Sequence, residues 1–190
     1  MRKIRAKSIL FGLVWGSAFL LIAGSGAEVR VATAELSTRE GRPAGRVVFT
    51  QQDEGVKVSV RITDLAPGEH ALHIHEKGKC LAPDFTSAGG HFNPGNAKHG
   101  FLNRQGPHAG DLPNIRVKPD GTLTTSFRTQ RITLKEEASH SLFIDGGTSV
   151  VIHRDPDDYV TDPAGKGGPR IACGIVKKGR PAGEKNNSLY

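Results

Sequence analysis

The stretch RVVFTQQDEGVKVSVRI (residues 46–62) decides the fold class of this chain. Its two ends, residues 46–50 and 56–62, are short runs rich in Val, Ile and Thr, and a polar segment that contains Asp53 and Gly55 separates them. Apolar and polar side chains roughly alternate along each run, which is typical of strands that bury one face and expose the other. The stretch therefore predicts two consecutive β-strands.

The same pattern recurs on both sides of this stretch, with Pro119-Asp120-Gly121 marking a tight turn. The further runs cover residues 29–36, 71–75, 115–118, 123–128, 149–153 and 171–176. No long amphipathic helix is visible, although residues 132–138 could form a short helical turn. Eight short strands with turn signals between them predict an all-β fold, an eight-stranded antiparallel Greek-key β-sandwich or flattened barrel.

Two long segments interrupt the strands, at residues 76–113 and 154–170. Both are rich in Gly, Pro, Asp and His and contain few apolar residues. Long ordered loops of this composition usually carry function rather than packing.

The N-terminus differs from the rest of the chain. Four basic residues among the first seven precede the apolar run 8–23 and the small residues 24–27, which is the order of a secretory signal peptide that ends near Ala27. An uncleaved membrane anchor is the alternative, but the run is shorter than the roughly 20 apolar residues that span a bilayer. We therefore expect a signal peptide at 1–27, one domain at 28–176, and a flexible polar tail at 177–190.

Charge excludes some partners. Removing residues 1–27 would take four of the 26 Lys and Arg and none of the 19 Asp and Glu, which leaves a formal charge of +3. A small charge with scattered lysines offers no stripe for phosphates, so we expect no nucleic-acid binding. We also expect no stable membrane association after cleavage.

The two cysteines, Cys80 and Cys173, belong to a chain that we expect to be exported. An even number of cysteines in an oxidising compartment favours a bridge between them. Two separate buried thiols are the alternative.

The histidines are concentrated in one part of the sequence, since all eight lie within residues 70–153. His73 and His75 alternate with Ile74 in a predicted strand, so both imidazoles point to the same face, where they could meet one metal ion. Alone, such a pair could equally be two surface histidines. His91, His99, His108 and Asp111 follow in the glycine-rich first loop, and three imidazoles with one carboxylate suit tetrahedral zinc. A solvated polar loop with scattered histidines is the alternative for that set.

Several blocks carry a resemblance to a known family. They are HIHEKGKC (73–80), SAGGHFNP (87–94), KHG (98–100), HAGDLPN (108–114), VVIH (150–153) and RIACG (170–174). In this order, from about residue 68 to 176, the chain resembles the copper/zinc superoxide dismutases, in particular the exported bacterial forms.

The resemblance implies a set of metal ligands. Copper would bind His73, His75, His91 and His153, and zinc would bind His91, His99, His108 and Asp111. His91 would then bridge both metals as an imidazolate, because each of its ring nitrogens must donate a lone pair.

The resemblance also assigns residues beyond the ligands. Asp157 would hold one copper histidine and one zinc histidine by hydrogen bonds, although Asp155 and Asp158 lie beside it. Arg170 would guide the anionic substrate to copper, with a plain surface arginine as the alternative. His70 and His140 correspond to no metal ligand.

The activity implied is the dismutation of superoxide to oxygen and hydrogen peroxide, in the periplasm or outside the cell. The resemblance also allows a homodimer. The main rival is an exported copper- and zinc-binding protein that stores or delivers metal without turnover. A zinc hydrolase is a further rival, but such enzymes leave one metal position open, whereas four protein ligands are expected here.

Overall fold

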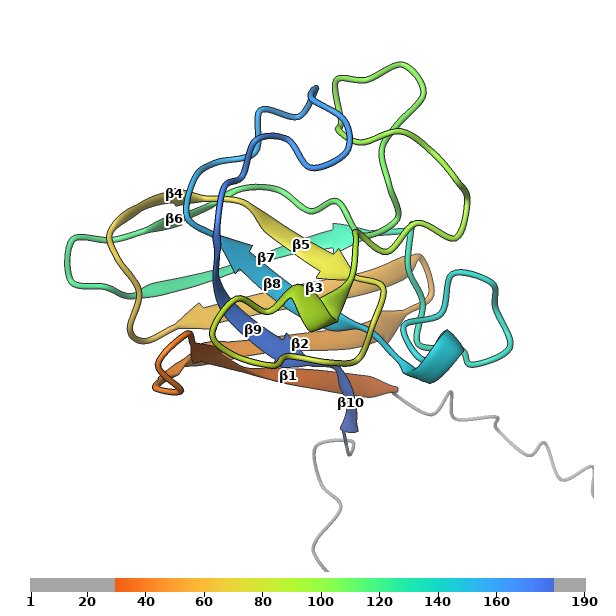
Figure 1. Cartoon of the computed structure of the whole chain (residues 1–190). Coiled ribbons are helices and arrows are strands. Elements are labelled where there is room, and N and C mark those ends of the chain that lie inside the picture. The colour runs from red at the N-terminus through yellow and green to blue at the C-terminus, as the bar shows by residue number, and fades with distance from the viewer. Residues whose placement is uncertain (1–29, 180–190) are drawn as a thin grey trace, which may run out of the picture.

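The computed structural model describes residues 30–179, which form ten β-strands and two short 3₁₀ turns (Figure 1). The strands are β1 Val31–Thr38, β2 Pro43–Gln52, β3 Gly55–Ile62, β4 Gly68–His70, β5 Leu72–His75, β6 Ile115–Val117, β7 Leu123–Thr129, β8 Ser149–His153, β9 Arg170–Ile175 and β10 Lys177–Gly179; the turns are η1 Thr86–Ala88 and η2 Ile144–Gly146. All eight predicted strands are present, and β4 and β10 are additional. Within residues 30–179 no helix has the length and apolar character needed to cross a membrane.

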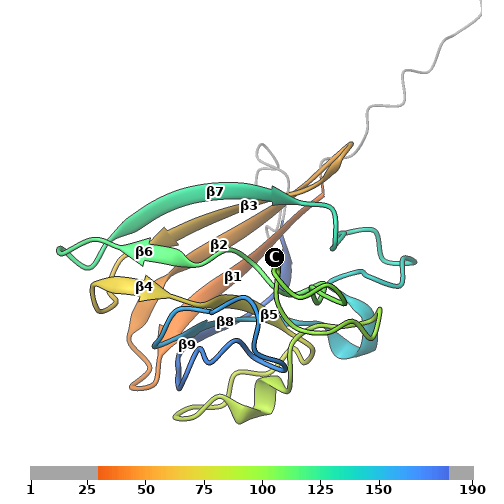
Figure 2. The ribbon, with the colours of Figure 1, turned by 90° about the horizontal axis from the view of Figure 1, so that it is seen from above.

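The sheet curls into a flattened barrel (Figure 2). Seven strands are hydrogen-bonded in the order β5-β8-β9-β1-β2-β3-β7, with β10 beside β1 and with β4 and β6 as a separate pair. Every pairing between strands is antiparallel. Neighbours that are far apart in sequence, such as β3 with β7 and β1 with β9, require the connections of a Greek key. The predicted fold class is confirmed.

Alternation along β3 shows why these residues form strands that close on a core. Val56, Val58, Val60 and Ile62 are buried, and Lys57 and the other residues between them are not. The inward side chains pack in one apolar cluster with residues from the other strands. In β5 and β8, by contrast, every residue is buried. Strands buried on both faces must be covered on the outside, and here the two long loops provide that cover.

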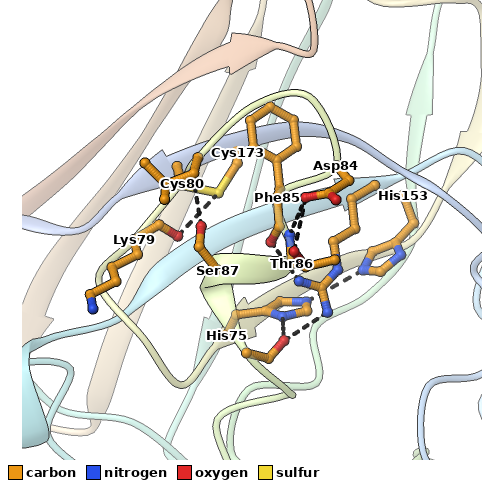
Figure 3. Close-up of a disulfide and its surroundings, with 12 residues drawn as sticks. His75, Lys79, Cys80, Asp84, Phe85, Thr86, Ser87, His153 and Cys173 are labelled. Atoms are coloured by element: carbon orange, nitrogen blue, oxygen red, sulfur yellow. Dashed lines mark hydrogen bonds between the residues drawn. A yellow bond between two sulfur atoms is a disulfide. The ribbon is translucent and has the colours of Figure 1, made fainter.

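Cys80 and Cys173 form a disulfide with a Cα–Cα distance of 5.7 Å, as predicted (Figure 3). The bond joins the first long loop to β9. Phe85, Ala88, Val151 and Cys173 pack beside it in a small second apolar cluster. The start of the first loop is therefore fixed to the barrel by both a covalent bond and buried apolar contacts.

Two details differ from the sequence-based expectations. Residues 132–138 form no helix; within them Ala138 N donates to Lys135 O at 3.3 Å in a turn, and the side chain of Gln51 in β2 accepts hydrogen bonds from Thr133 Oγ1 and Leu134 N, both at 2.8 Å. Residues 177–179, expected in the tail, form β10 and pair with β1. The expected signal peptide at 1–27 and the rest of the tail lie outside the described residues.

Replacing both Cys80 and Cys173 with Ala should lower the free energy of unfolding by about 2–4 kcal/mol, because the unfolded chain loses a long-range cross-link. Chemical denaturation of the metal-loaded protein would measure this. A reductant should destabilise the wild type but not the double variant. Equal denaturation midpoints without reductant would show that the bridge contributes nothing.

Candidate metal centre

Backbone pairing of the first loop with β5 assembles the site. Ile74 N donates to Gly110 O and Ile74 O accepts from Phe92 N, each at 2.8 Å, and Gly110 N donates to Phe92 O at 2.8 Å. The loop thereby makes bridges that place His91 opposite His75 and Asp111 opposite His73. Residues that are far apart in sequence thus reach the face of β5 that carries the two histidines.

The first group of side chains, which we call the four-histidine cluster, consists of His73, His75, His91 and His153. All four are buried, and one nitrogen of each lies within 4.8 Å of the others. His75 Nε2 and His153 Nε2 are 3.4 Å apart. His73 Nδ1 and His91 Nε2 are buried without any hydrogen-bond partner in the described chain. Buried nitrogens that converge without partners are costly unless a cation binds them, so this cluster fits a metal ion.

Hydrogen bonds on the outside of this cluster fix the histidine tautomers. His75 Nδ1 donates to Gly89 O at 2.9 Å, and His153 Nδ1 donates to Gly168 O at 3.0 Å. His73 Nε2 donates to Asp157 at 2.8 Å. Because these oxygens only accept, each of these nitrogens carries a proton, and the opposite nitrogen of each ring faces the cluster, where its lone pair can bind a metal ion.

The second group, which we call the mixed cluster, surrounds one oxygen of Asp111. Asp111 Oδ1 lies 2.9 Å from His91 Nδ1, 3.1 Å from His99 Nδ1 and 3.3 Å from His108 Nδ1. The other oxygen accepts hydrogen bonds from Gly100 N and His108 N, both at 2.9 Å, which holds the carboxylate in place. Three imidazoles and a carboxylate are a donor set that suits zinc.

Distances alone also permit a grouping of His73, His91, His99 and Asp111. His73 is the weaker candidate for that group, because its Nε2 is bonded to Asp157 and its Nδ1 is the unpartnered nitrogen of the four-histidine cluster. His108 Nδ1, in contrast, lies 3.4 Å from His91 Nδ1. The predicted set of His91, His99, His108 and Asp111 is therefore brought together, and His91 presents Nε2 to one cluster and Nδ1 to the other.

The two clusters have opposite electrostatics. Burial lowers the pKa of His91 to about 4 and that of His153 to about 3, and it lowers the pKa of His75 well below its usual value. Burial also acts on His99, but hydrogen bonds to Asp111 and Asp157 outweigh it and raise the pKa of His99 to about 9. At neutral pH without metals, these rings of the four-histidine cluster are neutral, while the mixed cluster carries a proton on His99.

Asp157 connects the two clusters. Its Oδ2 accepts from His73 and its Oδ1 accepts from His99 Nε2 at 2.9 Å and from Tyr159 N at 2.6 Å. A side chain at Gly165, whose φ is +60°, would overlap the Asp157 carboxylate and the His99 ring, so glycine is needed there. The neighbouring acids point elsewhere, Asp155 to Arg154 and Asp158 to Thr161.

The remaining predicted residues separate into two groups. Arg170 donates to Phe85 O at 2.6 Å and to Gly89 O at 2.7 Å, so its guanidinium lies beside the loop that holds His75. His70 bonds backbone carbonyls, including Arg154 O at 2.8 Å, and joins neither cluster. His140 also lies outside both clusters.

Sequence reasoning missed two residues that support the site. Asn114 makes a reciprocal pair with the backbone of Asp157, donating to its O and accepting from its N, each at 2.9 Å. Asn114 ends the quoted HAGDLPN block, which could have drawn attention to it. Arg131 donates to Asp111 O at 3.1 Å and lies 4.8 Å from the centre of the Phe101 ring. No local pattern marks Arg131, because its contacts depend on the folded loop.

Replacing Asp157 with Asn should weaken metal binding by about 10- to 100-fold, because one amide oxygen cannot accept from both His73 and His99. Competition titrations against a chelator would measure the affinities for copper and zinc. Asp158→Asn is the matched control, since Asp158 touches neither ring. Equal affinities in the two variants would contradict a role for Asp157 in orienting the ligands.

Comparisons with known proteins agree with this geometry. Residues 43–176 match the family model described as copper/zinc superoxide dismutase. A superoxide dismutase [Cu-Zn] from Aquifex aeolicus is 46% identical over 169 residues, covering 88% of this chain and 98% of the relative.

Solved structures give the same result. A double mutant of a superoxide dismutase-like protein from Bacillus subtilis has a TM-score of 0.73 and 42% identity, covering 75% of this chain and 95% of that one. The Cu/Zn superoxide dismutase from Brucella abortus has a TM-score of 0.61 and 28% identity, covering 77% of this chain and 99% of that one. The chain belongs to the copper/zinc superoxide dismutase family.

Proposed function

We propose that the four-histidine cluster holds copper, that the mixed cluster holds zinc, and that His91 links the two ions in a centre that dismutes superoxide. The observation that carries this proposal is the pair of buried, unpartnered nitrogens, His73 Nδ1 and His91 Nε2, which converge with two further inward-facing nitrogens. A bound cation would satisfy both nitrogens at once.

Two superoxide anions and two protons give one oxygen and one hydrogen peroxide. Bound copper supplies the one-electron redox change, and bound zinc supplies a fixed charge beside it. The protein supplies imidazoles, which suit both copper oxidation states, and hydrogen bonds to the outward-facing nitrogens of His73, His75 and His153 hold three of the rings in place.

His91 is the residue that can carry a proton in this reaction. Its Nδ1 lies at the mixed cluster, and its Nε2 is free on the side of the four-histidine cluster. Nε2 could take up a proton whenever copper does not occupy its lone pair, and could give the proton up when copper binds there again. Arg170, fixed by two backbone carbonyls, offers a positive charge that can hold a superoxide anion near the cluster.

The rival function, storage or delivery of metal without turnover, uses the same ligands. The full set of four histidines and the bridging position of His91 favour the enzyme, because delivery alone does not require a ring shared between two ions. We find no observation that favours the rival.

The protein acts outside the cytosol in this proposal, after removal of a signal peptide at residues 1–27, and its catalytic domain starts at residue 28. The disulfide supports an oxidising compartment, the periplasm or the cell exterior. The homodimer and the lack of nucleic-acid and stable membrane association stay predictions from the sequence.

Replacing His153 with Ala should abolish copper binding and superoxide consumption but leave about one zinc per chain, because His153 belongs only to the four-histidine cluster. Metal analysis and a superoxide-consumption assay on the same sample would test this. His140→Ala is the control and should keep both metals and the activity. A wild type that binds copper yet consumes no superoxide would support the storage protein instead.

Metal binding should release protons in a defined order. At neutral pH the metal-free protein holds a proton on His99, whose pKa is about 9, so zinc should release about one proton per ion and bind more tightly as the pH rises to about 9. Copper should then release about one further proton, from His91, in the zinc-loaded protein but not in the zinc-free one. Titration calorimetry in buffers of different ionisation enthalpy would count these protons. Equal release by copper in both forms would contradict the bridging role of His91.

A further inference from the structure

A small recess lies next to the four-histidine cluster. Arg39, Asp84, Thr86, Gly168, Pro169 and Arg170 line it. Gly168 O accepts the hydrogen bond from His153, and Arg170 shares Gly89 O with His75. Asp84 and Thr86 are drawn in Figure 3 with the segment that carries the disulfide. None of the four histidines lines the recess, but Gly168 and Arg170 connect its wall to the hydrogen bonds of His153 and His75.

Two arginines from different parts of the chain meet at this recess. Arg39, in the turn between β1 and β2, donates from Nε to Pro83 O at 3.0 Å. Arg170, at the start of β9, donates to Phe85 O and Gly89 O. The backbone carbonyls of one segment, residues 83–89, therefore orient both guanidinium groups. Each guanidinium has five N–H donors, so donors remain that can bind an anion.

Neither arginine is neutralised by a direct ion pair. Among residues 30–179, Arg39 and Arg170 have no carboxylate oxygen within ion-pair distance, whereas Arg42, Arg46, Arg116 and Arg154 each have one. Asp84 is the only acid that lines the recess. Its Oδ1 accepts from Thr86 N and Thr86 Oγ1, both at 2.9 Å, so its carboxylate is bonded to its own turn.

We propose that Arg39 is a second guiding cation and that the recess between Arg39 and Arg170 collects small oxyanions, superoxide in this case, before they reach the copper site. This inference rests on the proposed function. Two fixed positive charges in a concave site raise the local concentration of an anion and its rate of encounter. The negative charge of Asp84 repels the same anion and so weakens the attraction by the two arginines.

The proposal predicts effects of opposite sign for two charge-neutralising variants. At low ionic strength Arg39→Gln should lower kcat/KM about twofold, and Asp84→Asn should raise it by a similar factor, as expected for one charge acting across about 10 Å of water. Both effects should disappear in high salt. Arg39→Lys should keep the wild-type rate, because it keeps the charge but not the geometry of the bond to Pro83.

Arg128→Gln is the matched control. Arg128 is exposed on β7, at the opposite end of the strand order from β5, and loses the same charge. Stopped-flow measurement of superoxide loss over a range of ionic strength, with copper and zinc content determined for each variant, gives the readout. Arg170→Ala should show a larger loss and a flatter salt dependence than Arg39→Gln.

Three outcomes would overturn the role of Arg39. The first is an equal salt dependence of the rate in Arg39→Gln and Arg128→Gln, and the second is a lower rate in Asp84→Asn. The third is a loss of rate in Arg39→Lys as large as in Arg39→Gln, which would show that the bond to Pro83 matters and not the charge. An inactive, metal-loaded wild type would instead overturn the proposed function together with this inference. An active wild type with any of the three outcomes overturns the inference alone.

Discussion

The backbone pairing between β5 and the first long loop is the constraint on which the metal centre depends. The three hydrogen bonds among Ile74, Phe92 and Gly110 accompany two isolated β-bridges that join an otherwise irregular loop to β5. That pairing sets the register between His73, His75, His91 and Asp111, and a shift of one residue would point these side chains to the wrong face. The disulfide holds the other end of the same loop on β9, so the loop is fixed at two places.

The second long loop completes the centre from the other side. It supplies Gly168 O to His153 and the Asp157 carboxylate to His73 and His99, and Asn114 holds the backbone of Asp157. Each of these hydrogen bonds to a histidine ring uses the ring nitrogen that faces away from the metal position. The rings are thus fixed in both orientation and tautomer by groups that would not contact the ions themselves. Burial of β5 and β8 on both faces follows from the same arrangement.

The fold and the residues that form the two clusters could be predicted from the sequence because their signals are local. Alternation in runs such as 56–62 marks strands, and blocks such as HIHEKGKC mark ligands. Asn114, Arg131 and Arg39 could not be assigned roles in this way, because their contacts join segments that only the folded loops bring together. Gln51 shows the same limit, since its side chain bonds Thr133 and Leu134, which lie more than 80 residues further along the chain. The choice of Asp157 over Asp155 and Asp158 likewise required the positions of the two rings.

The position of one carboxylate explains why two clusters that share a histidine are suited to different ions. At the mixed cluster, hydrogen bonds to Asp111 and Asp157 outweigh burial and raise the pKa of His99, so a cation of fixed charge is favoured there. In the four-histidine cluster burial acts without a carboxylate among the inward-facing atoms, so His75, His91 and His153 stay neutral. Of the four rings only His91 would carry a negative charge, and only while it bridges both ions, so the ligands do not hold a bound metal in its higher oxidation state. An ion that must alternate between two oxidation states therefore fits the cluster without the carboxylate, and a redox-inactive ion fits the cluster that contains it.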